Sequence, residues 1–145
     1  MSSDQHKTVD FVLVRTMTGR ELVCLLLDRF PNVRDLVCPD KDSFEDPFRV
    51  YDSFAKMVIQ RSNDSGFVQS VVLFIDELAE TKGPLVYEVL MSSLLEGIAE
   101  NEQVARKIER TMTPHSRALL HEVEIKIYGR KSSTEVPGDC GKYKH

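Results

Sequence analysis

One stretch of the sequence, Ser65 to Thr81, constrains the fold more than any other. Its apolar residues recur at the three- and four-residue spacing of an α-helix and cover more than half of the helix circumference. They are Phe67, Val68, Val71, Val72, Phe74, Ile75 and Leu78. A helix this apolar needs neighbours on several sides to keep it from water. We therefore predict that it lies at the centre of the core.

Further amphipathic blocks flank this helix, separated by short turns that contain Gly, Pro, Asn or Ser. They span about 18–30, 50–61, 84–99, 102–110 and a last stretch from Thr113-Pro114 to Gly129. Helices of similar length joined by short turns predict antiparallel hairpins. The predicted fold class is mainly all-α, a single domain of five to six helices. Both an irregular bundle and a short helical-repeat-like array are consistent with this pattern.

The remaining segments do not follow a helical pattern. Val9 to Val14 is rich in β-branched residues, which is consistent with a short strand, a helix extension or an ordered arm. Residues 32–47 contain Pro and a cluster of acids and are predicted to be the longest loop. We expect residues 10–129 to form one domain, between a flexible extension at 1–9 and a flexible tail at 130–145.

Charge and cysteine usage narrow the functional classes. The net charge of −4 disfavours nucleic-acid binding, which needs clustered Lys and Arg. The apolar runs are shorter than the ~20 residues that span a bilayer, and the first residues do not resemble a secretory signal. Cys24, Cys38 and Cys140 have no spacing typical of disulfide frameworks or zinc sites. These features predict a cytoplasmic protein with neither nucleic acid nor membrane as its partner.

The residues that could support catalysis do not form a recognisable set. His115 and His121 are six positions apart on the last helix, so they point to different sides and are interpreted as ordinary surface residues. Cys24 lies within an apolar helix and is interpreted as a small core residue. No nucleophile, phosphate-loop or metalloprotease motif occurs in the sequence. We therefore predict that the chain is not an enzyme and needs no metal or cofactor, with a small enzyme as the less favoured alternative.

An acidic segment is the first candidate for partner binding. Four carboxylates and two aromatic rings lie within nine positions, at Asp40, Asp42, Phe44, Glu45, Asp46 and Phe48. Negative charge beside exposed aromatic anchors suits recognition of a basic protein surface. The alternative is a solvated loop whose two Phe side chains are buried in the core.

Glu96 is the second candidate, because it places a carboxylate in the apolar segment Leu94 to Ile98. One interpretation is structural: the carboxylate accepts N–H groups at the start of a neighbouring helix, and Gly97 allows close helix contact. The other interpretation is a contact with a protein partner. The acids between Asp76 and Glu102 are otherwise read as a solvated helix face.

Four segments between Thr18 and Arg130 carry a family resemblance. They are Glu21-Leu22 to Phe30-Pro31, Phe74 to Leu78, Leu94 to Ile98, and Thr113-Pro114 to Leu119. In these segments the chain resembles a family of small helical bacterial proteins of unassigned biochemistry. Members look like immunity proteins of interbacterial toxin systems, and the resemblance implies a protein that neutralises a cognate toxin effector by direct contact. The alternative is a small acidic secretion chaperone, a class that resembles α/β dimers and needs several strands.

Overall fold

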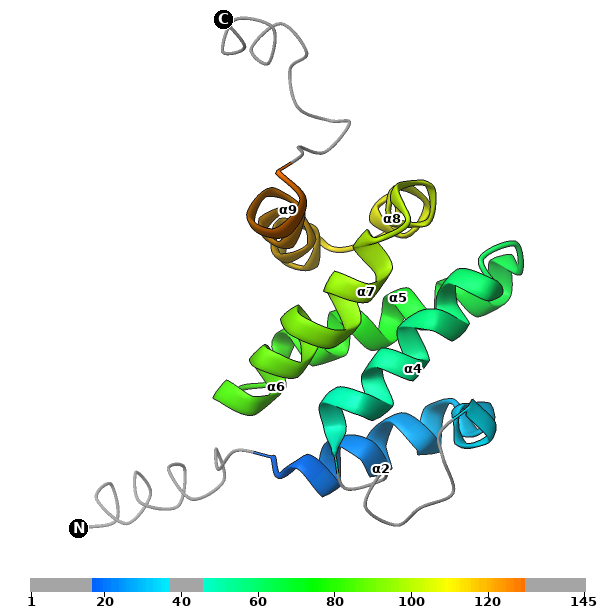
Figure 1. The fold of residues 1–145 in the computed structure, drawn as a ribbon, viewed down its shortest axis with the longest axis vertical. Coiled ribbons are helices and arrows are strands. Elements are labelled where there is room, and N and C mark those ends of the chain that lie inside the picture. The colour runs from blue at the N-terminus through cyan, green and yellow to red at the C-terminus, as the bar shows by residue number, and fades with distance from the viewer. Residues whose placement is uncertain (1–16, 37–45, 130–145) are drawn as a thin grey trace, which may run out of the picture.

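The computed structural model describes residues 17–36 and 46–129, and every regular element in these ranges is helical (Figure 1). The elements are α2 (Gly19–Arg29), η1 (Pro31–Leu36), α4 (Pro47–Gln60), α5 (Ser65–Glu80), α6 (Pro84–Val89), η2 (Leu90–Leu95), α7 (Glu96–Ala99), α8 (Glu102–Glu109) and α9 (Pro114–Tyr128). Because α6, η2 and α7 form one continuous helix, the described residues contain six helices besides the 3₁₀ turn η1. The predicted all-α class is confirmed.

Local capping explains where the helices begin and end. The α9 helix starts after the Thr113 cap and stops at Gly129, whose φ of 63° is left-handed, as the sequence predicted. The α4 helix begins at Pro47, three residues before the predicted start at Val50. The reason is Asp46, whose carboxylate accepts two backbone N–H groups of the first turn at 3.1 and 3.4 Å. Part of the predicted 32–47 loop is therefore helical, at both of its described ends.

The predicted helix over 84–99 has the expected length but is not uniform. Its middle, Leu90–Leu95, is a π-helix, a wider turn that shifts the side-chain phase by one residue. Four of its six residues, among them Leu94 and Leu95, are buried. The helical period of the sequence did not indicate this change of phase.

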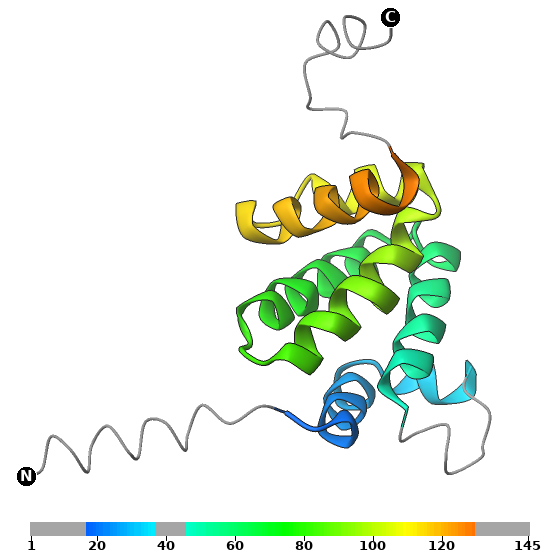
Figure 2. The ribbon, with the colours of Figure 1, turned by 60° about the vertical axis from the view of Figure 1, so that its left-hand side comes forward.

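The helices form an irregular bundle rather than a regular stack (Figure 2). The α8 and α9 helices make one hairpin at one end, α5 and the α6–α7 helix lie in the middle, and α2 with η1 lies at the other end. The α4 helix runs along the side and contacts α2, η1, η2 and α7, so it joins these layers. Because α4 crosses its neighbours instead of pairing with one of them, the repeat-like arrangement is not the one observed.

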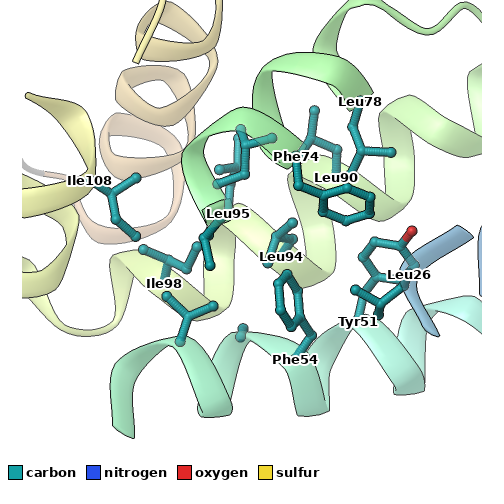
Figure 3. Close-up of a cluster of buried hydrophobic side chains, with 14 of the residues drawn as sticks. Leu26, Tyr51, Phe54, Phe74, Leu78, Leu90, Leu94, Leu95, Ile98 and Ile108 are labelled. Carbon is teal, nitrogen blue, oxygen red and sulfur yellow. The ribbon is translucent and has the colours of Figure 1, made fainter. Parts of the chain in front are cut away.

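The core is centred on aromatic rings that α5 shares with its neighbours. The ring centroid of Phe74 lies 6.0 Å from that of Phe54 and 6.3 Å from that of Tyr51 (Figure 3). It lies 5.5 Å from the ring centroid of Phe30. The continuous helix through η2 touches α4, α5 and α9, whereas α5 leaves one face open to solvent, including Leu73. The α5 helix also contacts α8 and α9 and buries six side chains, so it shares the predicted central position with the α6–α7 helix.

Cys24, which the sequence indicated to be a core residue, and the apolar Ile127 are both exposed. Cys24 lies on the outer side of α2, because only the face with Leu22 and Leu26 packs against the bundle. Ile127 is 49% exposed, because the inward stripe of α9 runs through Leu120 and Glu124 instead. Periodicity gives the spacing of a stripe, but the neighbouring helix decides its direction.

Candidate protein-binding surface

A groove of about 230 Å³ lies between the α6–α7 helix and the last turns of α9. Its lining consists of Tyr87, Glu88, Met91, Ser92, Glu96, Val123, Lys126 and Ile127. Tyr87 and Ile127 are 46% and 49% exposed, so each presents a large apolar surface to solvent in the same groove. Exposed apolar side chains gathered at one place are typical of sites that bind another molecule. We call these eight residues the α6/α9 groove.

Two hydrogen bonds join the α6–α7 helix to α9, the two helices that line the α6/α9 groove. The Tyr87 hydroxyl donates to the Glu122 carboxylate at 3.4 Å, and the Tyr128 hydroxyl donates to the Glu96 carbonyl at 3.3 Å. Glu122 also pairs with Lys126 at 3.8 Å. Loss of hydration, and next the Glu122 carboxylate, raise the pKa of Tyr87 above its ordinary value. The phenol therefore stays neutral and keeps its donor role near neutral pH.

The structure places the predicted site residue Glu96 in this groove. The described helices take their side-chain caps from Thr18, Asp46, Asp64, Asn101 and Thr113. The capping role considered for Glu96 is therefore not observed, and its side chain forms no hydrogen bond with the described part of the chain. The companion expectation for Gly97 is confirmed, because it lies against Ala55 of α4.

Only the end of the predicted acidic segment can be located. Asp40, Asp42, Phe44 and Glu45 lie outside the described residues. Asp46 caps α4, so this carboxylate has a structural role, and Phe48 is partly exposed on the first turn of the same helix. The two interpretations of the segment, a binding loop and a solvated loop, both stay open.

Asp46 belongs to a group of carboxylates that the fold brings together. Burial raises the pKa of Asp52, and the nearby carboxylates of Glu100 and Asp46 raise it further, while Lys56 opposes them. Asp46 and Glu100 therefore each lie close enough to Asp52 to repel its carboxylate. We call Asp46, Asp52 and Glu100 the acidic surface. Its residue Glu100 lies one helical turn after Glu96 of the α6/α9 groove.

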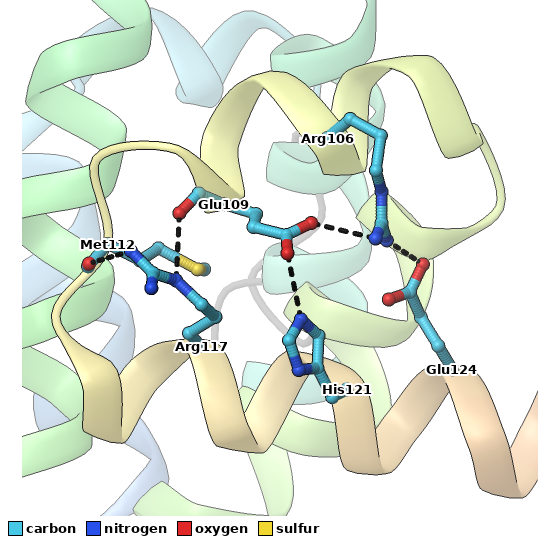
Figure 4. A network of polar contacts seen from close by, with 6 residues as sticks. All are labelled: Arg106, Glu109, Met112, Arg117, His121 and Glu124. Atoms are coloured by element: carbon cyan, nitrogen blue, oxygen red, sulfur yellow. Dashed lines mark hydrogen bonds and ion pairs between the residues drawn. The ribbon is translucent and has the colours of Figure 1, made fainter. Parts of the chain in front are cut away.

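A buried ionic cluster joins α8 to α9 (Figure 4). Arg106 pairs with Glu109 at 2.7 Å and with Glu124, and the Nε2 atom of His121 lies 2.9 Å from a Glu109 oxygen. Both carboxylates are buried. The guanidinium of Arg117 donates to the backbone carbonyls of Glu109 and Met112 at 3.2 and 3.0 Å. His121 is therefore part of this cluster and not the ordinary surface residue that the sequence indicated, whereas His115 is exposed.

The helical period of the sequence carries a signal for this cluster. Glu109 follows the buried Ala105 by four positions, and Glu124 follows the buried Leu120 by four, so both occupy core positions. The members of the cluster pair with one another across the contact between α8 and α9, so the cluster holds these two helices together. No group of three or more His, Cys, Asp or Glu side chains suited to a metal ion occurs among the described residues.

None of the helices in residues 17–36 and 46–129 combines the length and the hydrophobicity needed to cross a bilayer. Comparison with models of protein families, with known proteins and with solved structures finds no match to this chain. The resemblance to immunity proteins thus stays a prediction from the sequence segments alone.

Proposed function

We propose that this chain is an immunity protein that binds a cognate toxin effector directly and neutralises it. The observation that supports the proposal best is the α6/α9 groove, where Tyr87 and Ile127 are half exposed beside the carboxylates of Glu88 and Glu96. Apolar anchors bordered by charge are the usual composition of a protein-binding site. The partner that fits is a protein with apolar side chains set among basic ones.

The apolar anchors supply affinity. Burying a whole Ile side chain contributes about 1.5–3 kcal/mol, so burying the exposed half of Ile127 contributes about 1 kcal/mol. Tyr87 adds a ring that Glu122 already orients, which lowers the entropy lost on binding. Anchors of this kind slow dissociation more than they change the association rate.

The acidic side chains supply long-range electrostatic attraction to a basic partner. The acidic surface, Glu88 and Glu96 lie on a chain of net charge −4, so a basic toxin surface would be drawn toward it. Lys126 is the one cation among the eight groove residues. A secretion chaperone is less well supported, because that class needs several strands and the described residues form none.

Binding kinetics of the full chain against its cognate toxin would test the groove. Ile127→Ala should speed dissociation about fivefold, equivalent to about 1 kcal/mol. Ile125→Ala is a matched control, because Ile125 is 51% exposed on the same helix but does not line the groove. It should change the dissociation rate less than twofold. Equal effects of the two variants would remove the groove from the proposal.

The acidic segment has a separate test. Replacing Asp40, Asp42 and Glu45 by Asn or Gln should slow association and weaken its dependence on salt. Asp46 is left unchanged in this variant because it caps α4. Phe44→Ala should speed dissociation about tenfold. If the parent chain neither binds the toxin nor protects cells that carry it, the proposed function itself is wrong.

A further inference from the structure

A second cavity, of about 500 Å³, lies between the turn that joins α4 to α5 and the α8 helix. Its lining consists of Ser62, Asn63, Ser65, Val68, Gln69, Lys107, Arg110 and Thr111. The volume falls within the ~300–1,000 Å³ of small-molecule sites. It shares no residue with the α6/α9 groove, so it is independent of the proposed function. We call it the α5/α8 pocket.

The charge of the lining is opposite to that of the chain. Lys107 and Arg110 contribute two positive charges and no lining residue is acidic, although the chain carries a net charge of −4. The other side chains are hydroxyls, amides and the single apolar Val68. Donors and positive charge around a cavity select a ligand with negatively charged oxygens.

Lys107 is held in place without being neutralised. Its ammonium donates to the Ser62 carbonyl at 3.4 Å and to the Asn63 side-chain oxygen at 3.2 Å, both on the α4–α5 turn. Both acceptors are uncharged, so the full positive charge stays at the wall of the pocket. Arg110 lies three residues after Lys107, a spacing that places both on one side of the α8 helix.

Several other cations of the bundle are paired with carboxylates. The described ion pairs are Arg29 with Glu77, Arg61 with Asp64, Arg106 with Glu109 and Glu124, and Lys126 with Glu122. Within residues 17–36 and 46–129, neither Lys107 nor Arg110 has an acidic partner. The α5/α8 pocket therefore combines two unneutralised cations with a cavity.

We propose that the α5/α8 pocket binds a small organic anion through a phosphate or carboxylate group. The anionic group lies between Lys107 and Arg110, where the hydroxyls of Ser65 and Thr111 donate to its oxygens. The uncharged part of the ligand rests on Val68. Charge-assisted hydrogen bonds to two cations are about twice as strong as neutral ones, which makes the anionic group the main determinant of affinity.

Two ligands distinguish the sources of the anion: inorganic phosphate for the phosphate class and citrate for the carboxylate class. Each is titrated into the full chain at constant ionic strength, with chloride as the reference, and backbone amide shifts are followed by NMR. We expect saturable shifts centred on residues 62–69 and 107–111 with one ligand or both. Arg110→Gln and Lys107→Gln should each weaken binding at least tenfold, whereas Arg110→Lys should restore most of it.

Arg110→Gln is the decisive variant, because this exposed side chain makes no described hydrogen bond and its loss should leave folding intact. Lys82→Gln removes an exposed cation outside the pocket and serves as the charge-matched control, with binding unchanged. Shifts that match those caused by chloride, or that persist equally in Arg110→Gln, would overturn the proposal. Saturation by phosphate alone would assign the phosphate class, and saturation by citrate alone would assign the carboxylate class.

Discussion

A Cβ atom placed on Gly97 would lie 2.6 Å from the Cβ of Ala55, closer than side chains pack in proteins. The α7 and α4 helices therefore meet at two of the smallest residues available. This contact lets the buried Ile98 and Phe54 beside it pack into one layer (Figure 3). The glycine thus decides how closely α4 approaches the α6–α7 helix.

Gly97→Ala should destabilise the fold by about 1–3 kcal/mol, because the added methyl group forces two packed helices apart. The higher helix propensity of Ala, worth about 1 kcal/mol, offsets only part of this cost. Gly66→Ala is the control, since its Cβ would meet only the Asp64 carboxylate at 3.6 Å. That variant should be more stable than the parent by about 0.4–1 kcal/mol. Denaturant melts measure both, and a gain for Gly97→Ala would contradict the contact.

Phe74→Ala should cost about 3–5 kcal/mol in the free energy of unfolding, because the ring is buried against Phe30, Tyr51 and Phe54. Leu73→Ala, one position earlier on the same helix, is the control. Leu73 is 63% exposed, so its loss should cost no more than about 0.5 kcal/mol. Similar losses in urea melts would show that α5 is not packed as described.

Glu124→Ala should cost about 1.5–3 kcal/mol, because it removes a charge-assisted hydrogen bond from the largely buried Arg106, which keeps Glu109 as its other partner. Glu122→Ala removes a carboxylate from the same helix at an exposed position. Since exposed pairs contribute about 0–1 kcal/mol, this control should melt close to the parent. Thermal melts followed by circular dichroism compare the two, and a mild effect of Glu124→Ala would mean that α8 and α9 do not depend on the ionic cluster.

The pair of Arg29 and Glu77 should make stability fall in acid. The Arg29 guanidinium donates to the carboxylate and lowers the pKa of Glu77 below its ordinary value. A lowered folded-state pKa means that the stabilisation is present above the ordinary Glu value of about 4.3 and is lost as pH falls through the folded value. Glu77→Gln should therefore melt below the parent at pH 7, with the difference shrinking at pH 3. An equal difference at both pH values would exclude the ion pair as its cause.

Asp52 should show the opposite dependence on pH. Burial first, then Glu100 and Asp46, raise its pKa, so the folded state disfavours the carboxylate. The resulting cost is absent below the ordinary Asp value of about 3.9 and complete above the raised value. Asp52→Asn should therefore be more stable than the parent at pH 7 and no more stable at pH 3. A loss of stability at pH 7 in thermal melts would argue against carboxylate repulsion at the acidic surface.

The residues of the candidate sites could be predicted from the sequence to different degrees. Glu96 could be selected because a carboxylate within an apolar run conflicts with burial, and it does line the groove. Tyr87 and Ile127 could not be selected, because nothing local distinguishes an exposed apolar residue from a buried one. The α5/α8 pocket joins the α4–α5 turn to Lys107, about 45 residues later, and no local pattern reports such a distance.

The sequence by itself determined the all-α class and the ends of the helices, because capping and helical period act within a few residues. Thr18, Thr113 and Gly129 lie at helix ends for reasons that the nearest turn supplies. Only the tertiary structure decided which side of each helix is covered, and so it exposed Cys24 and buried Glu124. It also decided the π-helical phase of Leu90–Leu95. These outcomes depend on packing between residues distant in the chain, where burial contributes more free energy than local preference does.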